Sequence, residues 1–506
     1  MTKKKAPERA AAKTNDRARV SRRPVKGTPR RTCRDEKVKT RDSTSSGKQA
    51  KSSPKLERTT FRTSREMDFF SEKELTTQTG HPRGEWAQVI AKELIDNALD
   101  ASEESDMPPR IEIFADISGI TVRDNGPGIP DNTLAGTLDF SCRASNREMY
   151  VAPDRGAQGN ALKTLLGMPC VIDDECGRLI VEANGTRHEI VCRADPISQR
   201  AVVHDEKTKI PKRGGTTVRV EWGPRTDAGE TLWPFGWDDW DNVDSYDAQQ
   251  FRELVTGYPI FNPHAEITLD WFGERTTWEP TDTTWTKWKP CHPTNPHWYE
   301  RRHLERLIGA YITYDRDRET DRTVAQFLAE FDGLTGSRKR SRVLDDCDFR
   351  RVNLSELATD DGFNGDMLDK LLSTMQRHTK PVTVRRLGII GEQHIRDRLL
   401  GLGCVAESIR YKRVARVDDG VAFVLETAFG WLGDEAPDRR QIYAGANWSP
   451  GIRNPFRSFG KSGEGLEGYL RGLYAGANEP IIHVIHVAHP RVEFTDRGKT
   501  AIVVSE

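Results

Sequence analysis

The chain has 506 residues, and its 77 Lys and Arg side chains balance its 77 Asp and Glu side chains. This length allows two to four domains. No stretch approaches the ~20 consecutive apolar residues of a membrane span, and the N-terminus lacks the apolar core of a secretory signal. These features exclude the membrane and secreted classes, so we expect a cytoplasmic protein with no membrane partner.

The eight cysteines include no Cys-x-x-Cys pair, which is typical of reduced intracellular thiols. Cys291 and His292, with His297 nearby, are residue types that bind metals. A second pair of ligands is missing from this short cluster, so the pattern is only weak support for a metal site.

Residues 1–60 carry 20 Lys and Arg against 6 Asp and Glu, a net charge of +14. The segment has almost no large apolar residues and cannot bury enough surface to offset its chain entropy, which predicts a disordered arm. Phosphate neutralisation needs no folded shape, so the charge favours contact with nucleic acid over a merely solubilising tail.

The segment 85–101 predicts an amphipathic helix, because its apolar residues cover one arc at about 100° per residue. Glu93, Asn97 and Asp100 fall together on the opposite side. A solvated helix face often carries acids, but Asn is a poor choice for such a face. An Asn one turn after a Glu can hold a hard cation while the Glu orients a water.

Two apolar alternations at 110–116 and 120–123 predict a hairpin. Asp124 stands where the second strand ends, and Gly126 and Gly128 then produce an irregular loop. Such a sequence is a plain turn in most proteins. A carboxylate beside bare backbone also suits recognition of an amino group on a flat base.

A glycine-bearing loop that begins at Arg155 and Gly156 opens directly into an apolar-periodic helix near Ala161. This geometry directs backbone N–H groups and a helix N-terminus at an anion such as phosphate. A strand at 214–220 follows, and the hydroxyl of Thr216 is available to complete the same pocket.

The remaining chain contains three further kinds of segment. Nine of the twelve tryptophans lie between Trp222 and Trp298, and we interpret most of them as core or interface packing, with base stacking as the minor alternative. Residues 300–400 have helical spacing and include the basic run Arg338–Arg342. The last hundred residues return to strands such as Val421–Leu425 and Ile481–Val487.

The acidic helix, Asp124 loop, glycine loop and threonine strand, in this order within about 130 residues, resemble the four motifs of the GHKL (Bergerat-fold) ATPases. The resemblance implies a two-layer α/β ATPase domain in which Glu93 is the general base, Asn97 binds Mg²⁺ and Asp124 binds the adenine amino group of ATP. It places the other nucleotide-binding residues at Asp100, Gly126, Gly128, Arg155, Gly156, Ala157, Gln158, Gly159, Asn160, Ala161 and Thr216. Ala161 stands where the family prefers glycine, so a tighter backbone approach is expected there.

Two other nucleotide-binding patterns are absent from the sequence. Gly460-Lys461-Ser462 lacks the upstream glycine of a P-loop, because position 455 is Pro455. No Gly-x-Gly-x-x-Gly follows a strand. A histidine kinase is disfavoured because no dimerisation helix carries a phosphorylatable His.

Within the superfamily, the chain resembles the topoisomerase VI B subunit. The similarity covers the segments at 61–71, 93–101, 155–159, 262–269, 388–392 and 486–502. It implies an α+β chain: a disordered arm (1–60), the ATPase domain (61–285), a helical insert like a helix–two-turn–helix (286–385) and an α/β transducer-like domain (386–506). Lys499 then fills the place of the switch-loop lysine that contacts the terminal phosphate.

The resemblance also implies the activity and the partners. We expect a Mg²⁺-dependent ATPase that forms a homodimeric clamp on binding ATP, acts on DNA and pairs with a DNA-cleaving, topoisomerase VI A-like subunit. Arg338–Arg342 lies in the helical insert, where contact with DNA phosphates and a solvated loop are equally favoured. The rival hypothesis is a nucleotide-switched module that binds a partner protein, as in MutL-like or chaperone-like proteins.

Overall fold

A computed structural model describes residues 64–140, 148–156, 161–172, 177–222, 245–359, 362–433, 438–457, 464–495 and 500–503. All of them belong to one unit, Arg62–Glu506. The predicted arm at 1–60 lies outside the described residues, as do Ala157, Gln158, Gly159, Asn160 and Lys499.

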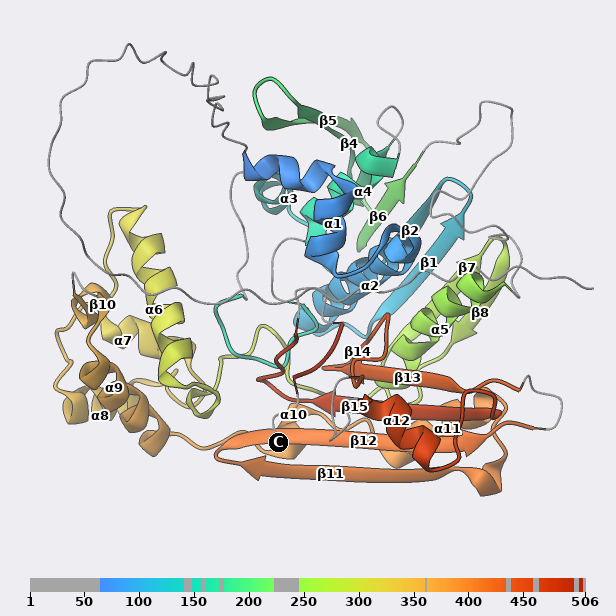
Figure 1. The fold of residues 1–506 in the computed structure, drawn as a ribbon. Coiled ribbons are helices and arrows are strands. Elements are labelled where there is room, and N and C mark those ends of the chain that lie inside the picture. The colour runs from blue at the N-terminus through green and yellow to red at the C-terminus, as the bar shows by residue number, and fades with distance from the viewer. Residues whose placement is uncertain are drawn as a thin grey trace, which may run out of the picture. The chain divides into compact units, whose positions relative to one another are not determined.

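The N-terminal half is built on an eight-stranded sheet with the order β5-β4-β3-β6-β2-β1-β7-β8 (Figure 1). β1 and β7 pair in parallel, and the other neighbours are antiparallel. The strands are β1 (Arg110–Asp116), β2 (Gly119–Arg123), β3 (Arg178–Ala183), β4 (Thr186–Asp195), β5 (Arg200–Lys209), β6 (Thr216–Glu221), β7 (Glu266–Trp271) and β8 (Glu274–Trp278).

Helices cover one face of this sheet and form the second layer (Figure 1). Strand β1 shows why: Ile111, Ile113 and Ala115 alternate with less buried residues, so one face is apolar and packs against the helices. The helices of this half are α1 (Glu72–Thr79), α2 (Trp86–Glu104), α3 (Asp131–Thr137), α4 (Ala161–Ile172) and α5 (Tyr246–Phe261), with short 3₁₀ turns at Arg65–Phe70 and Arg83–Glu85.

A helical region with its own core follows. Its core residues run from Trp288 to Val382, with one residue from the later sheet, Val421. The main elements are α6 (Arg301–Arg316), α7 (Val324–Phe327), α8 (Ser337–Cys347) and α9 (Gly365–His378), together with the two-stranded ladder β9 (Ala358–Thr359) and β10 (Gly362–Phe363). Short 3₁₀ turns lie at Pro296–Trp298, Leu328–Glu330 and Leu354–Leu357.

The C-terminal part is a five-stranded sheet with the order β11-β12-β15-β13-β14. One face packs on α10 (Val384–Leu387), α11 (Glu392–Gly401) and the end of α5, and α12 (Gly465–Gly472) packs on the other. A short 3₁₀ turn at Ala406–Ser408 follows α11. The strands are β11 (Arg410–Asp418), β12 (Val421–Trp431), β13 (Gln441–Ala446), β14 (Ser449–Pro450) and β15 (Ile481–Ala488).

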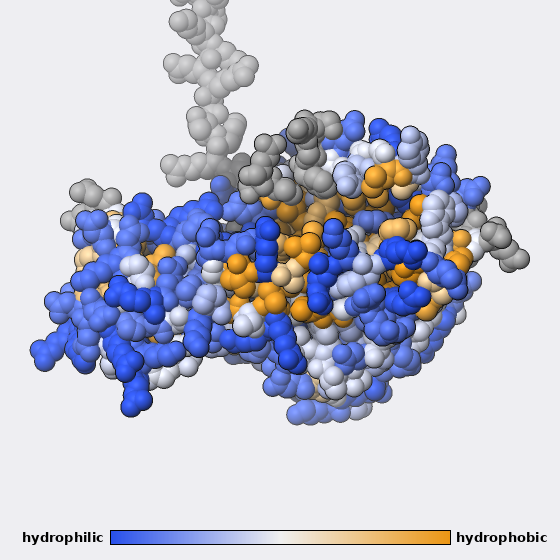
Figure 2. Space-filling view, turned by 90° about the horizontal axis from the view of Figure 1, so that it is seen from below, coloured by the Kyte–Doolittle hydropathy of each residue, from blue (hydrophilic) through white to orange (hydrophobic). Residues whose placement is uncertain are grey.

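Part of the α12 side of this sheet stays open. Val414, Phe429 and Trp431 are each more than a third exposed, and the strand register places them on the same face. Figure 2 shows hydrophobic residues gathered in the middle of the face seen from below.

These elements confirm the predicted α+β class, with a two-layer α/β domain, a helical insert and a second α/β domain. The boundaries at 285 and 385 remain predictions. The described tryptophans of the Trp-rich stretch pack as expected, with Trp222, Trp271, Trp288 and Trp298 almost fully buried. Within the described part of the chain, no helix is long and apolar enough to cross a membrane.

Candidate functional site

Helix α2 carries the first group of predicted site residues. Its apolar side is buried in the core, with Ile90, Ile95 and Leu99 completely inaccessible. On the other side Glu93 is half-buried and Asn97 is exposed. The Asn97 amide makes no hydrogen bond with any described residue, so its oxygen is available to a hard cation such as Mg²⁺. Asp100, the third predicted site residue on this helix, differs from the other two because it is buried.

Asp124 and Thr216 are 92 positions apart in the chain, and the structure brings them together. Strand β2 pairs with β6, and the ladder continues as the Asp124 N–H donates to the Thr216 carbonyl at 2.9 Å. The Asp124 carboxylate in turn accepts from the N–H groups of Gly126 (2.7 Å) and Thr216 (3.1 Å) at the same oxygen, Oδ1. Two backbone donors therefore fix the orientation of the carboxylate.

The pKa of Asp124 is raised because the side chain is largely buried. The hydrogen bonds from Gly126 and Thr216 lower it, but they do not outweigh the desolvation. A carboxylate in this position gains from a further donor, such as an exocyclic amino group. The adenine contact of Asp124 remains a prediction.

Two glycines shape this corner of the site. Gly215 has φ +87°, and a Cβ there would lie 1.9 Å from the Asp124 carbonyl oxygen, so a larger residue would disrupt the β2–β6 pairing. A Cβ on Gly126 would approach Asp124 Oδ1 to 3.0 Å and the Ala101 backbone of α2 to 3.4 Å. The Asp124 loop thus packs directly on helix α2. Sequence reasoning did not include Gly215 among the site residues, although the Gly-Gly pair before β6 was the available signal.

Arg155 and Asp100, both predicted to bind nucleotide, bind each other. The Arg155 side chain is fully buried, and Nη1 donates to Asp100 Oδ1 at 2.6 Å and to Glu103 Oε2 at 2.7 Å. Nη2 donates to Glu103 Oε1 at 2.7 Å and to Asn262 Oδ1 at 2.5 Å. These contacts give Arg155 a positioning role, because they hold the start of the glycine loop on helix α2.

Charge balance explains how this arginine can be buried. Burial alone raises the pKa of Glu103, but the charges of Arg155 and Lys287 outweigh it and hold that pKa well below its usual range. Lys287 Nζ lies 2.8 Å from Glu103 Oε2. Burial lowers the pKa of the neighbouring His264, which favours its neutral form. Sequence reasoning missed Glu103 and Lys287, since their partners are distant in the chain.

The glycine loop itself is only partly described. Gly156 is half-buried and follows Arg155 directly, and helix α4 begins at Ala161. The predicted phosphate contacts of Ala157, Gln158, Gly159 and Asn160 therefore remain predictions.

The residues on both sides of Lys499 form a short antiparallel pair. Phe494 bridges to Ile502, and the Thr495 N–H donates to the Ala501 carbonyl at 2.9 Å. Phe494 also lines a cavity of about 230 Å³ that is lined by Lys92 of α2 and Arg155 as well. The chain that leads to Lys499 thus lies close to the helix that carries Glu93.

The Cys291, His292 and His297 cluster gains no support as a metal site. No group of three or more His, Cys, Asp or Glu side chains among the described residues is arranged to hold a metal ion. His292 Nδ1 instead accepts from the Lys289 N–H at 3.1 Å.

The two-layer α/β fold, with helix α2 packed against the loop of the Asp124–Thr216 corner, is similar to the fold that the sequence resemblance implies. No family model matches the chain. The chain is similar to the B subunit of type 2 DNA topoisomerase 6 from Archaeoglobus fulgidus, with 23% identity over 450 residues. The match covers 82% of this chain and 66% of that protein, so the chain spans slightly less than two thirds of its relative's length.

Solved structures give more distant matches. The MutL ATPase domain of Aquifex aeolicus, complexed with ADP, matches at 11% identity and a TM-score of 0.28, covering 78% of this chain and 90% of that one. The gyrase B subunit of Myxococcus xanthus matches at 12% identity and a TM-score of 0.33, with coverages of 82% and 84%. The ATPase region of Saccharomyces cerevisiae topoisomerase II matches at 11% identity and a TM-score of 0.36, with coverages of 83% and 77%. We base no functional assignment on these three matches.

Proposed function

We propose that this protein binds and hydrolyses ATP as a dimeric clamp that acts on DNA, in the manner of a topoisomerase VI B subunit. One observation supports this function above others: segments that sequence reasoning assigned to one nucleotide site converge on helix α2. The Asp124 loop contacts α2 through Gly126, and Thr216 bonds to Asp124. Arg155 ties the start of the glycine loop to Asp100.

The described residues have distinct roles in this proposal. Asp124 binds the adenine amino group, and Asn97 binds Mg²⁺ through its exposed amide oxygen. Glu93 orients the attacking water and accepts its proton. Mg²⁺ would supply charge neutralisation at the phosphates, and backbone N–H groups at the start of α4 would add to it.

We assign Lys499, which follows the last strand of the second sheet in the sequence, as the residue that would complete the proposed site. An ammonium group near the terminal phosphate would neutralise charge that builds up as the phosphoryl group leaves. The cavity shared by Phe494, Lys92 and Arg155 supports this assignment, because it brings the chain leading to Lys499 next to α2.

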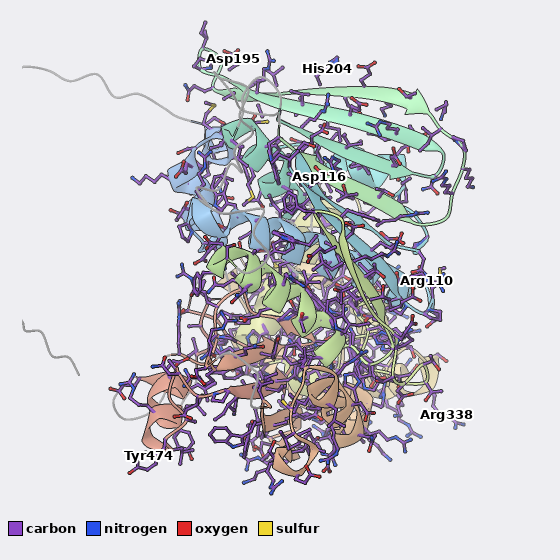
Figure 3. All side chains as sticks on the ribbon, turned by 90° about the vertical axis from the view of Figure 1, so that its right-hand side faces the viewer. Arg110, Asp116, Asp195, His204, Arg338 and Tyr474 are labelled. Atoms are coloured by element: carbon purple, nitrogen blue, oxygen red, sulfur yellow. The ribbon has the colours of Figure 1, made fainter. Side chains whose placement is uncertain are left out.

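The DNA contacts in this proposal come from basic side chains. In α8, Arg338, Lys339 and Arg342 are exposed and form no ion pair with any described residue. Figure 3 shows Arg338 at the outer edge of the helical region. With the arm at 1–60, these cations are suited to phosphates rather than to specific bases.

Steady-state ATP turnover with and without duplex DNA tests the function. We expect Mg²⁺-dependent hydrolysis that DNA stimulates, and a dimer on size-exclusion chromatography with a non-hydrolysable ATP analogue. Tight ATP binding without turnover would contradict the proposal and favour a nucleotide-switched module that binds a partner protein.

A further inference from the structure

A ring of buried contacts joins the glycine loop to the β13–β14 hairpin of the second sheet. In its first limb, Arg155 Nη2 donates to Asn262 Oδ1 at 2.5 Å, and Asn262 Nδ2 donates to the Trp448 carbonyl at 2.9 Å. One amide side chain thus contacts both the residue before Gly156 and the turn of the hairpin.

The second limb runs through two charged side chains. Glu103 binds Arg155 through both of its oxygens and also pairs with Lys287 at 2.8 Å. The Lys287 ammonium lies 4.6 Å from the centroid of the Trp448 ring. With Asp100, these buried contacts hold two positive and two negative charges, so each buried charge has a partner of opposite sign.

Trp448 has an unusual conformation at the end of both limbs. It and Asn447 form the two-residue turn between β13 and β14, with φ of 64° and 48°. Turns of this kind favour Asn and Gly, so a tryptophan with positive φ is strained and depends on its surroundings. Gly388, with φ +121°, allows the close approach of the Trp448 indole, because a Cβ on Gly388 would lie 2.9 Å from Trp448 Cζ2.

The polar groups around Trp448 are incompletely satisfied. The backbone N–H of Trp448 donates to His486 Nε2 at 2.9 Å. The proton of the neutral imidazole is therefore on Nδ1. Neither His486 Nδ1 nor Trp448 Nε1 has a hydrogen-bond partner within the described part of the chain, although both are buried. These two buried groups lie at the turn of the hairpin and on the neighbouring strand β15.

Open space lies next to the hairpin. The cavity of about 230 Å³ is lined by Lys92, Asp154 and Arg155 and by Asn447, Ser449 and Pro450 of the hairpin, and Asn447 Nδ2 donates to the Asp154 carbonyl at 3.4 Å. The hairpin therefore borders both the buried ring and an open volume.

We propose that Arg155 is a positioning residue that couples the glycine loop to the β13–β14 hairpin, with Asn262 as the direct link. This coupling rests on the proposed nucleotide function, since it needs a ligand at the loop after Gly156. It acts through the buried core and is distinct from the contact assigned to Lys499. Nucleotide binding shifts the hairpin between two arrangements because it changes the position of Arg155.

The variant Asn262→Asp adds a negative charge and removes the amide donor of the link, which bonds to the Tyr258 carbonyl as well as to the Trp448 carbonyl, each at 2.9 Å. The new carboxylate still accepts from Arg155, but it no longer donates to the Trp448 carbonyl. A second variant, Glu103→Gln with Lys287→Met, removes one charge of each sign. It breaks the path of contacts from Arg155 through Glu103 and Lys287 to the Trp448 indole. The matched control is Asp315→Asn with Arg322→Gln, which removes another largely buried ion pair, within the helical region.

Hydrogen exchange of Gln441–Gly451 is measured with and without a non-hydrolysable ATP analogue and Mg²⁺, alongside analogue affinity, kcat and KM. In the parent and the control, we expect the analogue to change hairpin exchange by about fivefold or more. In either test variant that response should be lost and kcat should fall, while analogue affinity and KM stay within about threefold of the parent.

A folded variant that binds the analogue and keeps the parent's hairpin response and kcat would overturn the coupling. If Asn262→Asp fails to fold, the charge-balanced variant decides by the same criteria. A parent that binds nucleotide without any hairpin response also overturns the coupling but leaves the proposed function intact. A parent that binds no nucleotide overturns both.

Discussion

At the scale of single residues, Glu93 occupies a half-buried position on a helix that is otherwise largely buried. Replacing Glu93 with Ala removes the proposed general base but no adenine contact. We expect ATP turnover to fall by roughly 10²–10⁴-fold with nucleotide affinity nearly unchanged. Steady-state kinetics and analogue titration measure the two effects separately.

Glu72→Ala is the matched control for this variant, because Glu72 is an exposed acid on the neighbouring helix α1. It should turn over ATP at the parent rate. Near-normal turnover in Glu93→Ala would remove Glu93 from the role of base.

Asp124→Asn tests the adenine contact at the same scale. An amide can present its own donor to the adenine amino group, and the buried site would then hold two facing donors. ATP affinity should fall by at least roughly tenfold, since a charged hydrogen bond is worth about 1.5–3 kcal/mol. Unchanged affinity in a titration with a fluorescent ATP analogue would refute the assignment.

The raised pKa of Asp124 adds a pH dependence to this prediction. The carboxylate accepts from the amino group only when it is ionised. ATP affinity should therefore fall as the pH drops through the raised pKa, at a higher pH than for an ordinary aspartate. The Asp124→Asn variant should lack this step, which affinity measurements across the acidic range would show.

The sequence was informative about residues that belong to local motifs. Asp124 is recognisable at a strand end, and Asn97 by its unusual place on a helix face. The bonds from Arg155 to Glu103 and Asn262 were not predictable, because they span 52 and 107 positions and depend on burial. Hence Arg155 was assigned to the ligand, whereas its described contacts are internal.

At the scale of elements, Phe494 and Ile502 pair on either side of Lys499, and Phe494 lines the same cavity as Lys92 of α2. Lys499→Ala should reduce ATP hydrolysis strongly and weaken analogue-induced dimerisation, because the terminal phosphate loses its ammonium contact. ADP affinity should stay nearly constant, since ADP lacks that phosphate. Size-exclusion chromatography, ADP titration and turnover measurements check the three effects.

Lys209→Ala provides a control for the loss of a lysine at an exposed strand end. It should dimerise and hydrolyse ATP like the parent. A Lys499→Ala protein that also behaves like the parent would contradict the switch-loop assignment.

The basic arm and helix α8 are further elements with a shared prediction. Deleting residues 1–60, with a net charge of +14, should weaken DNA binding and flatten its salt dependence without changing basal ATPase activity. Replacing Arg338, Lys339 and Arg342 with Ala should reduce the log–log salt slope by about 2–3, if each contacts one phosphate. Filter binding over a salt series measures both.

Identical salt dependence with and without the arm would show that it is a tail with no DNA contact. Parent-like binding by the α8 variant would likewise assign that helix surface to solvent.

Predicted elements agree with the structure where periodicity is strong. The hairpin of β1 and β2, the helix around Glu93 and the strand at Ile481–Val487 all lie where the sequence places them. The pairing of β1 with β7, and the convergence of α5 and the β13–β14 hairpin, depend on contacts between distant segments. Local patterns carry no information about such pairings.

At the scale of the whole molecule, the described contacts join the first sheet's helices to the second sheet at several points. Ser449 of β14 donates to Asp96 of α2 at 2.8 Å, and Arg453 pairs with Glu85 at the start of the same helix. The helix that carries Glu93 is therefore held from both sides. A structural change in either sheet should therefore alter the position of Glu93, the proposed catalytic residue.

The parallel pairing of β1 with β7 also has a consequence for synthesis of the chain. Arg110 pairs with Glu266, 156 positions later. At 5–20 residues per second, a ribosome needs about 8–30 s to make the intervening segment. Throughout that time one edge of β1 has no partner, so the nascent chain exposes a strand edge that invites aggregation. Chains stalled after Trp222 should therefore be more protease-sensitive and more dependent on chaperones than chains stalled well beyond Trp278.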